Sequence, residues 1–190
     1  MNPTGILMAE HILFDRALRV LSSIAQRMVD GRSVPRDAVA RLLDFFVNFV
    51  DGVHQQKEER LLFPALVRAG VIDEDGPIER LRNEHDVVRG HLGDMRAAAS
   101  ELLSSQIARL RFADAARSFR VLLSQHMARD NHVLYMMANR VLDDPEQAEL
   151  IREFATFEER AAGPEARARY QASIEDLEVR LEAMAEGARL

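Results

Sequence analysis

The chain has 190 residues, of which 47% are hydrophobic and 29% are charged, and its formal net charge at pH 7 is -6. This length and composition are ordinary for one folded domain, and the negative charge argues against the basic surface that nucleic acid or anionic lipid would require. The chain has no cysteine, which excludes disulfides, thiolate metal sites and iron–sulfur ligation, so any metal must be bound by histidine and carboxylate.

The N-terminal segment carries Glu10 and Asp15 and lacks a basic region leading into an apolar run, so it is not typical of a signal peptide. No later apolar run approaches the length that crosses a membrane. We therefore expect a cytoplasmic protein with neither a membrane nor a nucleic acid as partner.

Apolar residues recur at three- and four-residue steps through most of the chain, which predicts amphipathic helices. Pro64 is expected to kink the second helix, and Asp144 is expected to be the N-cap of the fifth. The helices are expected over residues 3–29, 37–70, 77–104, 106–142, 144–162 and 164–186.

No segment shows strand alternation, so the predicted class is all-α. We expect an antiparallel up-down four-helix bundle over residues 1–142. Residues 143–190 are expected to form a C-terminal helical extension of one or two helices packed on the bundle.

The stretch around His54 and Glu58 carries the first chemical signal. The two residues are four apart, so on a helix both side chains face one point and form a chelating pair. An imidazole and a carboxylate together suit iron, manganese or zinc better than magnesium or calcium. A solvated ion pair on a helix surface is the alternative reading.

The spacing recurs downstream, where His126 and Asp130 are again four residues apart. Glu10–His11 precedes His54 by 43 residues, and Glu84–His85 precedes His126 by 41, counted from histidine to histidine. A twofold-repeated pair of antiparallel helices is the economical interpretation.

In each predicted helical hairpin, the two histidines lie at the same distance from the turn along the helix axes. The midpoint between the first two histidines falls at Arg32–Ser33, and that between the second two falls at Ser105–Gln106; both lie where a turn is expected. Aligning these levels predicts one core layer that binds two metal ions, each with two histidines, bridged by the carboxylates. The predicted ligands are His11, His54, Glu58, His85, His126 and Asp130.

The sequence contains the ordered set His, His-x-x-x-Glu, His, His-x-x-x-acid, with Glu before the first and third His, and the Lys57–Pro64 run. In these features it resembles the hemerythrin-like (HHE cation-binding) proteins over residues 1–142. The resemblance implies a four-helix bundle with a non-haem di-iron centre bridged by an oxo or hydroxo group. Its ligand pattern is similar to that of iron-cluster repair proteins and bacterial hemerythrin-like proteins linked to nitric oxide or peroxide. Zinc or manganese could substitute for iron.

Several residues allow more than one reading. His91 and His132 lie six positions after a predicted ligand, about 240° around an α-helix, and are expected at the surface. Asp15 could compete for metal, but a solvated or hydrogen-bonding role fits better, and Arg89 takes the matching place in the third helix, where oxygen carriers of the family have a fifth histidine. Tyr135 is read as core. Glu10 and Glu84 could be hydrogen-bond acceptors, proton carriers or solvated residues.

The residues and the resemblance together favour a di-iron protein that reacts with O2, NO or peroxide, in stress response or in repair of iron centres. The first alternative is an iron- or oxygen-dependent sensor or store without turnover. The second is a structural zinc-binding bundle. No catalytic residue is predicted, and the oligomeric state is open, with a homodimer as one option.

Overall fold

A computed structural model describes residues 2–102 and 105–186, and all regular structure in these ranges is helical. Three stretches, labelled η, have the wider π-helical geometry. The elements in chain order are α1 (Pro3–Val29), α2 (Arg36–Asp44), η1 (Phe45–Gln55), η2 (Glu58–Leu62), α3 (Phe63–Arg68), α4 (Pro77–Ala99), α5 (Gln106–Arg129), η3 (Asp130–Leu134), α6 (Tyr135–Val141), α7 (Asp144–Ala162) and α8 (Ala166–Glu186).

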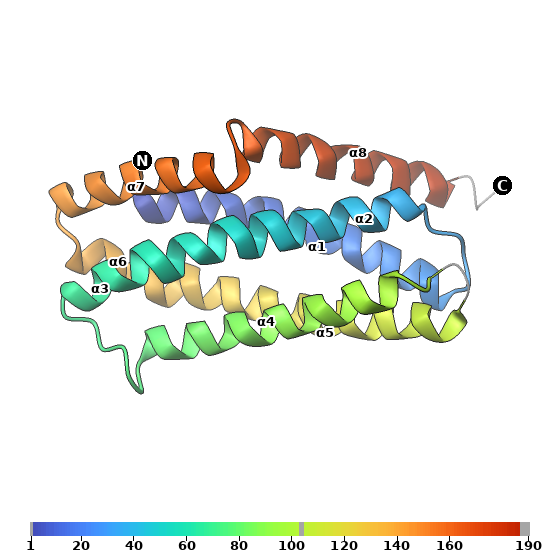
Figure 1. The fold of residues 1–190 in the computed structure, drawn as a ribbon, viewed down its shortest axis with the longest axis horizontal. Helices are drawn as coiled ribbons and strands as arrows, with labels where there is room; N and C mark the ends of the chain where they lie inside the picture. The colour runs from blue at the N-terminus through green and yellow to red at the C-terminus, as the bar shows by residue number, and fades with distance from the viewer. Residues whose placement is uncertain (1, 103–104, 187–190) are drawn as a thin grey trace.

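Four long rods form the bundle (Figure 1). The first is α1, the second runs without a break from α2 through η1 and η2 to α3, the third is α4, and the fourth runs from α5 through η3 to α6. The fourth rod packs along both α1 and α4, and the second contacts the same two helices on the other side. The predicted all-α class is confirmed.

Capping side chains and a turn glycine mark the ends of the rods. The Asn2 and Ser105 side chains cap α1 and α5 by accepting backbone N–H groups, and Gly31 adopts a positive φ of 68° after α1. Several predicted boundaries differ from the structure. The sixth helix begins at Ala166, although it was expected from residue 164, and the second ends at Arg68, although it was expected to reach residue 70. The third helix ends at Ala99, although it was expected to reach residue 104, and residues 103–104 lie outside the described ranges. The cap of α7 is Asp143, one residue before the expected Asp144, in a capping box with Glu146.

The C-terminal helices α7 and α8 lie along one side of the bundle, over α1 and the second rod (Figure 1). Leu150 and Phe154 of α7 share a buried cluster with Leu7 and Leu62, and Ile174 of α8 belongs to the main core. Both helices therefore bury apolar side chains against the bundle. The proposed domain boundary at residue 142 stays a prediction.

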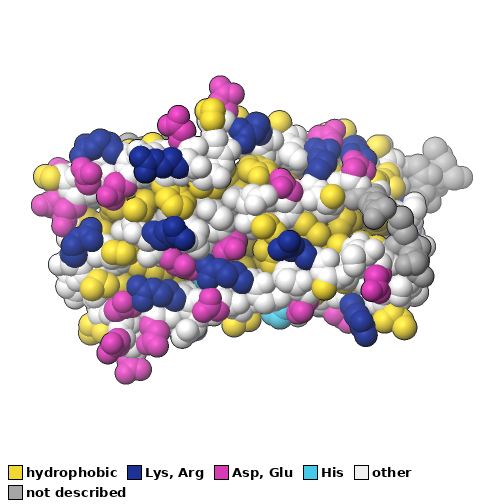
Figure 2. Space-filling model, viewed as in Figure 1, with side chains coloured by type: hydrophobic (Ala, Val, Ile, Leu, Met, Phe, Trp, Pro, Cys, Tyr) yellow, Lys and Arg dark blue, Asp and Glu magenta, His cyan; other side chains and the backbone are white. Residues whose placement is uncertain are grey.

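The outer surface offers no concentration of one charge on the face that Figure 2 shows. Arginine side chains are interspersed there with aspartate and glutamate. Among the described residues, no helix is both long and apolar enough to cross a bilayer.

Candidate metal centre

The four rods bring all six predicted ligand residues together in the interior. Every one of them is buried, and the largest exposed fraction in the set is 3%, for His11. His11 comes from α1, His54 and Glu58 from the second rod, and His85 from α4. His126 and Asp130 come from the fourth rod.

The four imidazoles form two pairs. The Nε2 atoms of His11 and His54 lie 3.0 Å apart, and those of His85 and His126 lie 2.9 Å apart. Each pair thus joins the two helices of one hairpin. This agrees with the prediction that the two histidines of a hairpin are equally far from its turn.

The two carboxylates lie between these pairs. Glu58 Oε2 is 3.7 Å from Nε2 of His54 and 3.3 Å from Nε2 of His85. Asp130 Oδ2 is 3.1 Å from Nε2 of His126 and 4.0 Å from Nε2 of His11. One oxygen of each carboxylate therefore approaches both pairs.

A π-turn begins at each of these carboxylates. The backbone carbonyl of Glu58 accepts the N–H of Phe63, and that of Asp130 accepts the N–H of Tyr135, five residues on. Each turn holds one more residue than an α-helical turn, so it shifts the helical phase of the residues after it.

That shift changes which apolar side chains face the site. A regular α-helix would return Leu61 and Val133, seven residues after His54 and His126, to the face of those histidines, but Leu61 is only half-buried and Val133 is 50% exposed. The next residues, Leu62 and Leu134, are fully buried. Such π-turns are frequent at functional sites, because they re-aim side chains that a regular helix would misplace.

The outward nitrogen of every imidazole meets an acceptor. Nδ1 of His54 donates to Glu10 at 2.8 Å and Nδ1 of His126 donates to Glu84 at 3.0 Å. Nδ1 of His85 donates to Glu59 at 2.7 Å.

Nδ1 of His11, the fourth imidazole, donates to the side-chain oxygen of Asn131 at 2.9 Å. In the neutral tautomer with its hydrogen on Nδ1, which these acceptors favour, each imidazole presents the lone pair of Nε2 to the interior.

Cations hold the three carboxylate acceptors in place. Lys57, itself fully buried, donates to Glu10 at 2.5 Å. Arg129 donates to Glu84 at 3.0 Å.

Arg89 donates to Glu59 at 2.5 Å and to Asp51 at 2.7 Å. The residue at the fifth-histidine position therefore supports a histidine partner. A guanidinium does not bind a metal itself, because it stays protonated.

The pKa values follow from this arrangement. Burial acts to raise the pKa of Glu10, but the hydrogen bond from His54 and the charge of Lys57 outweigh it and lower the pKa. Burial and the field of His54 lower the pKa of His11 to about 3. Burial and the charge of Glu58 raise the pKa of Asp130 well above its ordinary range. Two carboxylates in one dry pocket do not both ionise readily without a counter-charge.

The inner atoms of the cluster call for a cation. Glu58 Oε2 and both carboxylate oxygens of Asp130 are buried without a hydrogen-bond partner among the described residues. Opposed Nε2 lone pairs 3.0 Å and 2.9 Å apart repel unless a cation or a proton lies between them. Three of the six, Glu58, His85 and His126, offer ligand atoms that all lie within 4.8 Å of one another. The donor set, nitrogen and carboxylate oxygen, suits transition metals.

The hemerythrin HHE cation-binding domain model matches residues 2–138 and, in an overlapping second match, residues 77–187. The chain belongs to this family. Neither the curated proteins nor the solved structures gave a significant match. The second match of the hemerythrin domain begins with the second hairpin, in agreement with the internal repeat seen in the sequence.

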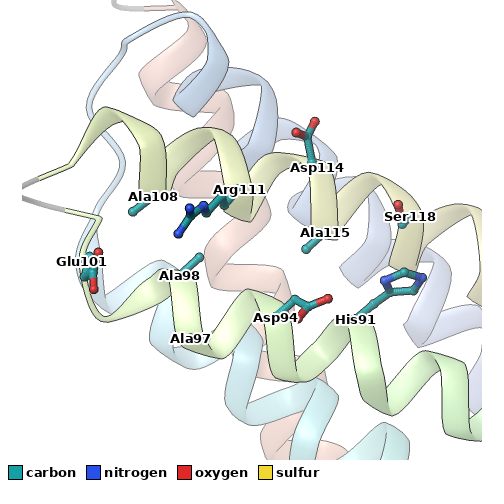
Figure 3. Close-up of a pocket in the computed structure, with 10 residues that line it drawn as sticks. All are labelled: His91, Asp94, Ala97, Ala98, Glu101, Ala108, Arg111, Asp114, Ala115 and Ser118. Carbon is teal, nitrogen blue, oxygen red and sulfur yellow. The ribbon is translucent and has the colours of Figure 1, made fainter.

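Residues outside the six also have defined places in this hemerythrin domain. His132 and Asp15 are exposed. His91 lines a hollow of about 590 Å³ between α4 and α5, which Asp94 and Arg111 also line (Figure 3). None of the six predicted ligands lines that hollow.

Tyr135 was expected to be a core residue, and its burial bears this out, but it also contacts two of the predicted ligands. It is buried, stacks on the His11 ring at 5.7 Å between centroids, and donates its hydroxyl to Glu58 Oε1 at 2.7 Å. The sequence signal that could have found it is its place five residues after Asp130, one turn beyond the predicted ligands once the π-turn is counted.

Proposed function

We propose that this protein is a non-haem di-iron protein whose two iron ions, joined by an oxo or hydroxo bridge, react with a small ligand such as O2, NO or peroxide. The proposed role is oxidative or nitrosative stress response, or repair of iron centres. The proposed iron ligands are His11, His54, Glu58, His85, His126 and Asp130. Zinc or manganese could substitute for iron.

One observation carries this proposal: two opposed pairs of imidazole nitrogens with one oxygen of each carboxylate between them. The symmetry of the donors supports two ions over one, since each pair supplies two nitrogens and shares two carboxylates. A single ion would leave one pair of lone pairs facing each other.

The chain's own groups define what such a centre could do. Iron at these positions would supply redox chemistry and binding of small ligands. The surrounding residues hold the imidazoles through Nδ1 and exclude water, because all six predicted ligands are buried. Such an enclosure admits diatomic molecules or peroxide more readily than larger substrates.

Arg89 separates this proposal from reversible oxygen carriage. The guanidinium is engaged by Glu59, Asp51 and Asp86 and leaves the His85–His126 pair without a third histidine. With equal nitrogen donors on both sides, a ligand can bridge the two positions or bind to both. Such binding favours reaction with peroxide or NO over a long-lived oxygen adduct.

The test is anaerobic loading with Fe2+ followed by exposure to oxygen. A stoichiometry of two irons per chain and an oxo-to-iron charge-transfer band in the near ultraviolet are expected. A protein that is stable only as a colourless zinc form would contradict the proposal and favour the structural alternative. Catalytic turnover of peroxide or NO would then separate an enzyme from a sensor or store.

A further inference from the structure

The internal repeat makes the outward partners of the imidazoles directly comparable. Glu10 and Glu84 each precede the first histidine of their half and accept from the second one. The cations Lys57 and Arg129, which hold those two glutamates, are 72 residues apart, as are the two second histidines. At these positions the halves are chemically alike.

The halves differ at the remaining pair of partners. Glu59 follows Glu58 and accepts from His85, whereas Asn131 follows Asp130 and accepts from His11. These two acceptors are also 72 residues apart, so a carboxylate in one half stands where the other half has a neutral amide.

The two acceptors also differ in whether a cation holds them in place, and the carboxylate is again the more strongly held. Glu59 is held by Arg89, whereas the residue matching Arg89 in the first half, at an offset of 74, is the exposed Asp15. His11 is also the most exposed of the six, at 3% against 0% for His85. His11 is therefore the least strongly held imidazole of the four.

We propose that the two metal positions are inequivalent: the His85–His126 position fills first and binds its ion more tightly, and the His11–His54 position exchanges its ion more readily. This inference rests on the proposed two-metal centre and adds an order to it. The residue that sets the order is Asn131.

The physical cause lies in the basicity of the imidazole. A carboxylate that accepts Nδ1–H pushes electron density toward Nε2 and fixes the ring, whereas an amide does so more weakly. The His85–His126 position has two imidazoles supported by carboxylates and the His11–His54 position has one. Loss of one such partner typically weakens metal affinity about 10- to 100-fold, and we expect the two positions to differ by this factor.

A titration of metal-free protein with Co2+, followed by its visible absorption in competition with a chelator, tests the inference. The unmodified protein should bind two Co2+ in two phases whose affinities differ by about 10- to 100-fold. In His126→Ala the tight phase should be lost. In His11→Ala it should remain, with the weak phase lost.

Two isosteric variants isolate the acceptors. Asn131→Asp should strengthen the weak phase and bring it toward the tight one, and Glu59→Gln should weaken the tight phase by a comparable factor. Each should also shift the Co2+ absorption of the phase it affects and leave the other phase unchanged. His132→Ala, one residue after Asn131 and exposed, is the control and should change neither.

Two outcomes would overturn the inference alone. These are two Co2+ ions bound with indistinguishable affinity in the unmodified protein, and loss of the tight phase in His11→Ala. Failure to bind more than one Co2+ or Fe2+ under any condition would instead contradict the two-metal centre. The two failures are therefore distinguishable.

Discussion

Lys57 offers a quantitative test of the buried ion pairs that surround the histidine and carboxylate cluster. Its ammonium is fully buried and donates to Glu10 at 2.5 Å and to Glu158 of α7 at 3.1 Å. Lys57→Met keeps most of the stem and removes the charge, so that Glu10, itself fully buried, loses its counter-ion. Breaking a buried pair in this way costs about 3–5 kcal/mol of unfolding free energy. For a chain of this length that corresponds to a fall in Tm of about 6–20 °C.

The assay is thermal and urea unfolding of the unmodified protein and Lys57→Met in the same metal state. Lys57→Met combined with Glu10→Gln should recover part of the loss, because the double variant leaves no uncompensated charge on Glu10. Arg152→Met, which removes an exposed ion pair with Glu149, is the matched control and should leave Tm unchanged. A loss below about 1 kcal/mol in Lys57→Met would refute the reasoning, since that is the value of a surface pair.

Three further predictions concern the metal positions. Glu58→Ala should lower metal content at both positions and lower Tm, because the carboxylate lies between both histidine pairs; full two-metal loading of this variant, measured by metal analysis, would refute the bridging role. His91→Ala and His132→Ala should leave metal content and optical bands unchanged, and a lost metal in either would place that histidine in the centre. Arg89→His should lengthen the lifetime of an oxygen adduct in stopped-flow absorption, whereas an adduct of the unmodified protein stable for hours and released under vacuum would contradict the proposed reactivity.

The helices and their meeting point could be predicted because periodicity and turn residues are local signals. The Gly31 turn and the Ser105 cap lie next to the midpoints between the paired histidines, where the chain was expected to reverse. The helical hairpins then bring His11 to His54 and His85 to His126 without further assumptions.

The π-turns could not be predicted from periodicity, because a single added residue leaves the apolar pattern readable in either phase. A regular α-helix would direct Val133 inward, whereas the π-turn directs Leu134 there. Pro64 explains part of the irregularity in the second rod, since it has no N–H to continue an α-helix. The matching position of the fourth rod is Met136, so proline is not required for a π-turn there.

The sequence predicted some of the groups that accept hydrogen bonds from the imidazole Nδ1 atoms. Hydrogen bonding was one of three roles considered for Glu10 and Glu84, and both donor–acceptor distances bear it out. Glu59 and Asn131 were missed, because each follows a predicted ligand and its direction depends on the π-turn that begins there. An offset of 72 aligns Glu59 with Asn131, but it does not show that either accepts a hydrogen bond from an imidazole.

The most direct test of the central claim is a crystal structure of the iron-loaded protein with anomalous data collected at the iron absorption edge. Two iron peaks are expected, one at the His11–His54 pair and one at the His85–His126 pair, with Glu58 and Asp130 contacting both. A single peak, or iron bound away from these two pairs, would contradict the account.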